Sequence, residues 1–108
     1  MFEGNVVELK MEKQLLEHEE MDLKVYHAEA IKYDESNENV YLKLEEGELT
    51  ELSLDAVYQC QLHMETETVL WSGVISKRYC SAKGKMLYMK ITSGFFEQLH
   101  EDKYVTIK

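Results

Sequence analysis

The sequence contains no proline among its 108 residues, and no part of it is of low complexity. Linkers between domains are usually rich in proline, glycine or polar residues, so nothing in this chain marks a domain boundary. No segment is repeated either. A single domain over residues 1–108 is therefore expected, because most domains contain roughly 50–200 residues.

Long apolar runs are also missing. A membrane-spanning helix needs about 20 mostly apolar residues, and no stretch of this chain comes near that length. The first residues, MFEGNVVELK, lack the basic segment followed by an apolar stretch that makes up a signal peptide. These two absences predict a cytoplasmic protein without a membrane partner.

Cysteine is scarce, with two residues in the chain, Cys60 and Cys80. Two cysteines do not make the disulfide framework of a small secreted domain. Cys60 and His63 have the spacing of two metal ligands, but they lie in a segment that alternates like a strand. Side chains three positions apart in a strand point to opposite faces, so we expect neither a metal site nor a cofactor.

Sequence motifs of catalysis are missing as well. The chain contains no Gly-x-Ser-x-Gly, no Gly-x-Gly-x-x-Gly and no phosphate-binding loop. Its histidines are scattered, and none lies beside a serine or cysteine in a recognisable nucleophile motif. We therefore expect no catalytic residue and no enzymatic activity.

The net charge of -9 is unevenly distributed. Residues 1–55 hold 16 acidic and 5 basic side chains, whereas residues 56–108 hold 5 acidic and 7 basic ones. A strongly acidic protein repels polyanions over long distances, so nucleic acid and anionic membranes are not expected as partners. A local basic patch in the second half remains compatible with this balance.

The sequence does have a clear hydrophobic period of two, which is typical of half-buried strands. The residues predicted to face inward in four of these strands are Val7, Leu9 and Met11; Val40, Leu42 and Leu44; Tyr58, Cys60, Leu62 and Met64; and Leu87, Met89 and Ile91. Closure into a barrel buries such faces and also removes exposed sheet edges. The pattern therefore predicts an all-β fold, a small antiparallel (split) β-barrel of roughly six to seven strands.

Three segments depart from this alternation. EKQLLEHEEM, residues 12–21, predicts a loop or at most a short helix, and ELSL, residues 51–54, predicts a short strand or strand lead-in. SGFFEQLHED contains Ser93 as a candidate cap for one helical turn. The final run Tyr104–Lys108 also alternates, and it is compatible with a closing strand, in which Val105 and Ile107 face inward, or with the first strand of a second domain.

Trp71 is the only tryptophan, and Gly73 follows it on the same side of the predicted strand. A glycine at this position leaves space for the indole or marks a bulge that bends the strand for closure. Packing of Trp71 in the core or at a barrel corner is the main interpretation. The alternative is that Trp71 anchors a partner.

One stretch has the composition of a binding site. SKRYCSAKGKMLYMK, between Ser76 and Lys90, contains several bases, no acid and two interleaved tyrosines. Bases and aromatic rings beside a glycine turn can hold a phosphate or stack on a nucleobase. The candidate ligand-binding residues are Lys77, Arg78, Lys83 and Lys85. The alternative is a basic hairpin that balances the acidic first half of the chain and docks on it.

The order of features along the chain resembles a known family. GNVVELK is followed by a long hairpin with an acidic turn, VYHAEAIKYDESNENVYLKL, and by LTELSLDAVYQCQLHM. A tryptophan-bearing strand, a basic turn and an apolar strand follow in VLWSGVISKRYCSAKGKMLYMKI. Over residues 4–92 this order resembles the N-terminal barrel that precedes the PilZ domain in flagellar-brake-type proteins of bacteria. An unrelated small barrel, such as a flavin-type split barrel, is the alternative.

The resemblance lacks the residues that bind cyclic di-GMP in that family. The segment that matches the junction to the PilZ domain, EQLHEDKYVTIK, contains no arginine in place of the family's arginine-x-x-x-arginine motif. The (Asp/Asn)-x-Ser-x-x-Gly motif does not occur anywhere in the chain. The resemblance therefore implies a PilZ-like module that does not itself bind cyclic di-GMP.

Together these observations predict a non-enzymatic regulatory or protein-interaction module. The resemblance implies a link to motility or cyclic di-GMP signalling, and the expected partner is a protein, with self-association as an option. The alternative is binding of a nucleotide or other anionic ligand through the basic hairpin. A weaker alternative is a flavin-type split-barrel protein.

Overall fold

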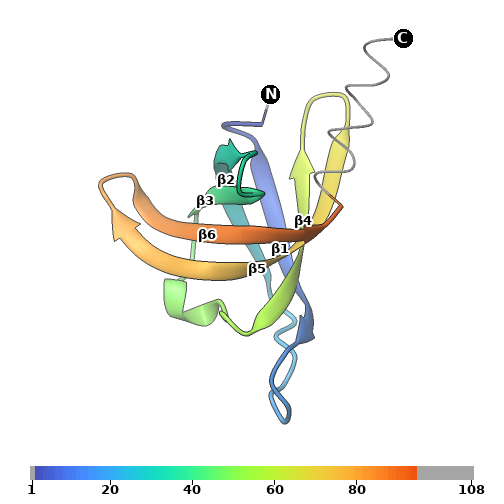
Figure 1. Cartoon of the computed structure of the whole chain (residues 1–108). Coiled ribbons are helices and arrows are strands. Elements are labelled where there is room, and N and C mark those ends of the chain that lie inside the picture. Colours follow the sequence, from blue (N-terminus) through green and yellow to red (C-terminus); the bar gives the residue numbers. More distant parts are fainter. Residues whose placement is uncertain (1, 95–108) are drawn as a thin grey trace.

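The computed structural model describes residues 2–94 and consists of antiparallel β-strands and one short 3-10 helix (Figure 1). The elements are β1 (Val6–Gln14), β2 (Val25–Asp34), β3 (Asn39–Leu44), η1 (Leu49–Glu51), β4 (Ala56–His63), β5 (Thr68–Ser81) and β6 (Gly84–Ser93). Within the described residues, no helix has the length and apolar character needed to cross a membrane.

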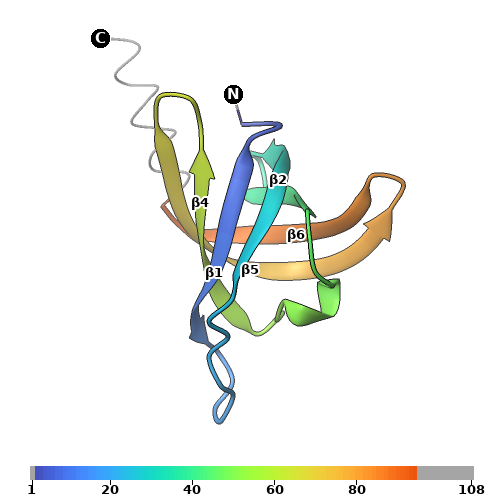
Figure 2. The same cartoon turned by 180° about the vertical axis from the view of Figure 1, so that it is seen from behind.

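The six strands form a closed barrel in the order β1-β2-β3-β6-β5-β4, and every neighbouring pair is antiparallel. Figure 2, from behind, shows β1 lying between β2 and β4, which is the contact that closes the sheet. Closure gives every strand two neighbours and so removes, within the barrel, the edges along which sheets aggregate. The predicted all-β barrel of roughly six to seven strands is confirmed.

Alternating residues of these strands fill the interior, as the hydrophobic period predicted. Val7, Leu42 and Leu87 are completely buried, whereas Glu8 and Tyr41, at alternate positions, lie at the surface. Of the residues predicted to face inward, Met64 alone is half-buried, because it lies just beyond the end of β4. The core therefore occupies the inside of the barrel, and the outer wall and the loops carry the exposed side chains.

Trp71 lies in this core with 2% of its surface exposed, and its indole N–H donates to the sulfur of Met89 at 3.5 Å. The register of β5 against β6 shifts between Ser72 and Gly73, which is the predicted bulge. A Cβ atom on Gly73 would lie 2.7 Å from the backbone oxygen of Lys90. Core packing of Trp71 and a bulge at Gly73 are therefore both confirmed.

Two boundaries differ from the sequence expectation. Residues 51–54 do not form a strand, because the preceding segment turns into η1. The carboxylate of Glu51 accepts a hydrogen bond from the backbone N–H of Glu48 at 2.8 Å, which stabilises this turn. At the other boundary, β1 continues through Gln14 because its last residues pair with β4, and the loop begins only after it.

The predicted closing strand Tyr104–Lys108 lies outside the described residues. The helical turn expected after Ser93 also falls mostly on residues 95–102, which are outside them. Ser93 itself is the last residue of β6.

The longest hairpin extends beyond the barrel as a curved arm (Figure 1). β5 contains 14 residues, and only its first part pairs with β4, at Thr68 to Val74. A second register shift between Ile75 and Lys77 bends the strand where the arm begins. The arm therefore carries the predicted basic hairpin away from the barrel wall.

Candidate functional site

A row of four side chains crosses four neighbouring strands on the outside of the barrel. Lys32 of β2 is paired with Tyr41 of β3, Tyr41 with Tyr88 of β6, and Tyr88 with Lys77 of β5. Residues paired across antiparallel strands share one side of the sheet. Because Leu42 beside Tyr41 is buried in the core, the row faces outward.

The aromatic centre of this row is in close contact. The rings of Tyr41 and Tyr88 are 4.7 Å apart between centroids, with an interplanar angle of 50°. The ammonium of Lys77 lies over the Tyr88 ring, 5.7 Å from its centroid, within the range of a cation–π interaction. The row therefore presents two packed tyrosine rings with a cation at each end.

Two hollows flank the row. One, of about 650 Å³, is lined by Tyr41, Leu54, Lys77, Arg78, Tyr79 and Tyr88. The other, of about 580 Å³, is lined by Glu3, Ile31, Lys32, Tyr33, Tyr41, Tyr79, Ser81, Lys83 and Met86. Tyr41 and Tyr79 line both hollows, so the two form one recessed surface around these rings. We call the set Lys32, Tyr41, Lys77, Tyr79, Lys83 and Tyr88 the tyrosine–lysine face.

The hydroxyl of Tyr88 is held by a buried neighbour. The side-chain amide of Asn39 donates to this hydroxyl at 2.8 Å and to the backbone oxygen of Asn37 at 3.1 Å. Partial removal of water raises the pKa of the Tyr88 phenol above its ordinary value, and the neighbouring Tyr41 adds to this shift. Tyr88 is therefore a positioned, neutral hydrogen-bonding group at physiological pH.

The structure gives the predicted basic residues of the arm different contacts. Lys77 and Lys83 belong to the tyrosine–lysine face. Arg78 lines the same hollow as Lys77, but its guanidinium donates to the backbone oxygen of Leu52 at 2.6 Å. The ammonium of Lys85 donates to the backbone oxygen of Gly47 at 2.6 Å. Lys77 and Arg78 thus share one hollow, Lys83 lines the neighbouring one, and Lys85 contacts the segment before η1.

Arg78 and Lys85 have a structural partner in the acidic half of the chain. Besides Gly47, Lys85 lies 3.3 Å from the carboxylate of Glu48, and Arg78 also reaches the backbone oxygen of Leu49 at 3.4 Å. These contacts tie the arm to the segment around η1. They agree with the alternative interpretation from the sequence, in which the basic hairpin docks on the acidic first half.

Half of the row was missed by the sequence interpretation. Lys32 and Tyr41 lie in the acidic half of the chain, where no basic patch was expected. The alternation of β3 does indicate that Tyr41 faces outward, since Val40 and Leu42 face inward. What the alternation does not indicate is that β3 lies beside β6, which brings Tyr41 onto Tyr88.

Cys60 and His63 lie on opposite faces, as their spacing predicted, with Cys60 buried and His63 exposed. Complete burial raises the pKa of the Cys60 thiol, which stays protonated and shielded from solvent. Among residues 2–94, no group of three or more histidine, cysteine, aspartate or glutamate side chains is arranged to hold a metal ion.

Comparison of the chain with protein-family models, with curated proteins and with solved structures gives no match. The molecule is a small six-stranded antiparallel barrel, and the likeness to the barrel before the PilZ domain stays a resemblance in the order of sequence features.

Proposed function

We propose that this chain is a non-enzymatic protein-interaction module and that the tyrosine–lysine face is its recognition surface. The observation that carries the proposal is the outward row Lys32–Tyr41–Tyr88–Lys77. Tyrosine is enriched at protein interfaces because its ring supplies a large rigid contact area and its hydroxyl a hydrogen bond. Here Asn39 already positions one of those hydroxyls before any partner binds.

The partner that suits this face carries carboxylates around an apolar centre. Lysines lie at both ends of the tyrosine pair, and Lys83 lines the neighbouring hollow. The whole chain has a net charge of -9, but fields are screened over about 8 Å at physiological ionic strength. A partner in contact with the face therefore interacts with these lysines more strongly than with carboxylates on the far side of the barrel.

The test is capture of a partner with variants of the face. We expect the wild-type chain to retain a protein from a lysate of its native host. The double variant Lys32→Ser, Lys77→Ser should retain little of that protein. With the purified partner, Tyr41→Ser with Tyr88→Ser should raise Kd by roughly 30-fold or more, because truncation of an interface hot spot costs about 2 kcal/mol. Calorimetry measures the Kd values.

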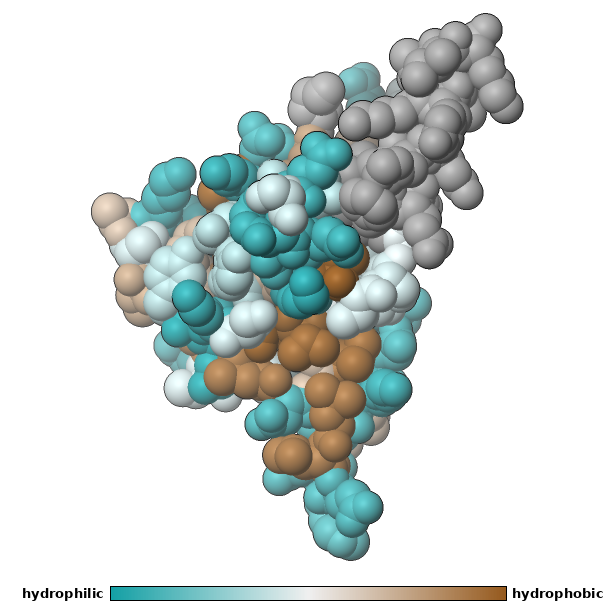
Figure 3. All heavy atoms as spheres, in the orientation of Figure 1, coloured by the Kyte–Doolittle hydropathy of each residue, from teal (hydrophilic) through white to brown (hydrophobic). Residues whose placement is uncertain are grey.

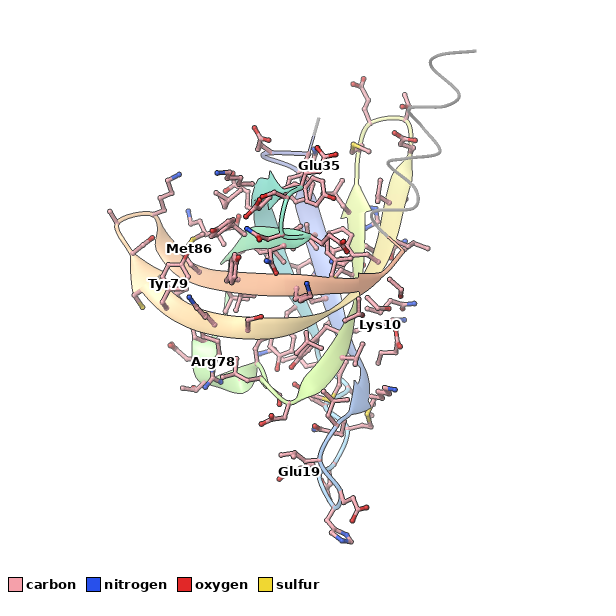
Figure 4. The ribbon with its side chains drawn as sticks, viewed as in Figure 1. Lys10, Glu19, Glu35, Arg78, Tyr79 and Met86 are labelled. Carbon is pink, nitrogen blue, oxygen red and sulfur yellow. The ribbon has the colours of Figure 1, made fainter. Side chains whose placement is uncertain are left out.

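The matched control is Lys10→Ser with Lys13→Ser, which removes the same charge from exposed positions of β1. In Figure 4, Lys10 lies on the far side of the ribbon from Tyr79 and Met86. This variant should bind like the wild type. Equal loss of binding in both lysine variants would refute the proposal, because net charge alone would then explain the interaction.

The second candidate function is binding of a nucleotide or other anionic ligand on the same face. Its specific support is the ammonium of Lys77 over the Tyr88 ring, beside a hollow of about 650 Å³. A base can stack on such a ring while the lysine contacts a phosphate. Calorimetric titration with ATP and GTP distinguishes the two candidate functions. Saturable micromolar binding that is lost in Tyr88→Ser would favour the nucleotide-binding candidate.

The proposed biological setting is regulation of bacterial motility or surface behaviour, without binding of cyclic di-GMP. The setting is supported by the resemblance of residues 4–92 to the barrel before the PilZ domain. The lack of cyclic di-GMP binding is supported by Arg78, the only arginine of the chain, whose guanidinium contacts the oxygen of Leu52. A calorimetric titration with cyclic di-GMP should therefore show no saturable micromolar binding.

A further inference from the structure

The loop between β1 and β2, residues 15–24, exposes a concentration of large apolar side chains. Leu23 is 87% exposed, Leu15 and Leu16 are each 51% exposed, and Met21 is also exposed. Single exposed leucines are ordinary on protein surfaces, but four large apolar residues within one short loop are not. Figures 1 and 2 show this loop projecting from the barrel at the end away from the N-terminus.

The loop is anchored rather than folded back over its own leucines. The backbone N–H of Leu15 donates to the oxygen of Asp55 at 2.9 Å, and the side chain of Gln14 donates to the oxygen of Glu20 at 2.8 Å. His18, with a φ of 69°, reverses the chain at the tip. These bonds fix the start of the loop to the segment before β4 and to Glu20, while the apolar side chains of the loop face solvent.

Carboxylates lie in the same loop as these apolar side chains. Glu17, Glu19 and Glu20 are exposed at the tip. The one lysine of the loop, Lys24, lies 2.7 Å from the carboxylate of Glu51 and therefore neutralises that residue rather than the tip. Figure 3 shows apolar surface above a hydrophilic lower end of the molecule. An apolar surface next to carboxylates suits a partner that has apolar side chains next to lysines or arginines.

We propose that the β1–β2 loop is a second docking site and that it binds a basic amphipathic segment of a protein. The apolar side of that segment contacts Leu16 and Leu23, and its lysines or arginines pair with Glu17, Glu19 and Glu20. An anionic membrane is the wrong partner because these carboxylates repel it. This surface does not include any residue of the tyrosine–lysine face, so the proposal is independent of the function proposed above.

The probe is a fluorescein-labelled peptide of leucine and lysine, with leucines at the i, i+3, i+4 and i+7 positions of a helix. Fluorescence anisotropy of this peptide with the whole chain, at about 0.15 M salt, should show saturable binding. A peptide of the same composition with a scrambled order should bind at least 10-fold more weakly. Binding of both peptides with equal affinity would overturn the proposal, because it would reflect charge alone, and so would no binding.

Variants of the chain locate the site. Leu16→Ser with Leu23→Ser should raise Kd for the peptide at least 10-fold, whereas Val6→Ser with Leu70→Ser, at exposed apolar positions outside the loop, should leave it unchanged. The double variant Glu17→Gln, Glu20→Gln should weaken binding several-fold. The control double variant Glu65→Gln, Glu67→Gln, at exposed positions outside the loop, should leave binding unchanged. Circular dichroism checks that each variant is folded. Equal effects of test and control variants would overturn the proposal.

Sedimentation velocity of the chain without peptide tests whether a second copy of the chain, rather than a basic segment, occupies the loop. We expect a monomer, because two copies that meet at this loop would bring Glu17, Glu19 and Glu20 of one copy close to the same carboxylates of the other. A dimer that Leu16→Ser with Leu23→Ser dissociates would overturn the proposal and show that the loop binds a second copy of the chain.

Discussion

Replacing Trp71 with alanine should lower the free energy of unfolding by about 3–5 kcal/mol, the usual cost of truncating a large buried aromatic side chain. The indole is 2% exposed, donates to the sulfur of Met89 and lies 6.5 Å from the ring of Phe2 between centroids. Its removal leaves a cavity that the closed barrel cannot collapse to fill. Urea denaturation followed by circular dichroism measures the loss.

The neighbouring Leu70 provides the matched control. It is 44% exposed, so Leu70→Ala removes a side chain from the outer wall and should cost less than about 1 kcal/mol. A similar loss in both variants would contradict the inward orientation of Trp71. It would instead favour the alternative in which the indole is a surface anchor for a partner.

Gly73→Ala should lower the free energy of unfolding by about 2–3 kcal/mol, although alanine is normally the better strand residue. The added methyl group would lie 2.7 Å from the backbone oxygen of Lys90 and 2.8 Å from the side chain of Met89. A backbone atom cannot move aside as a flexible side chain does, so the bulge between β5 and β6 has to distort. Urea denaturation again measures the change.

Gly4→Ala separates steric contact from backbone strain. Gly4 has a φ of +84° and no atom within 4 Å of the position of a Cβ, so only the left-handed backbone opposes alanine there. The cost should be about 1–2 kcal/mol, without any contribution from contact. A neutral Gly73→Ala would contradict the close approach of β5 and β6 at the bulge.

Much of this fold follows from local rules. The alternation of Val40, Leu42 and Leu44 requires one buried face, and Gly73 two residues after Trp71 indicates a bulge, so both could be read without a structure. The turn at η1 was not predicted. It depends on the Glu51 side chain hydrogen-bonding to the backbone of Glu48, which strand periodicity does not describe.

The candidate site was predicted only in part because it depends on contacts between distant strands. Lys77 and Lys83 were identified from local composition, as were Arg78 and Lys85, which donate to backbone oxygens near η1. Tyr41 joins the site only because β3 pairs with β6. Hydrophobic alternation reports which side a residue faces, but it carries no information on which strand lies next to it.

We propose the tyrosine–lysine face as the recognition surface of this chain. Amide NMR spectra of the isotope-labelled chain, recorded during titration with the captured partner, test it most directly. We expect the largest shift changes around Lys32, Tyr41, Lys77 and Tyr88, on four neighbouring strands, with little change at Lys10 on β1. Changes confined to β1 and β4, with none on β3 and β6, would contradict it.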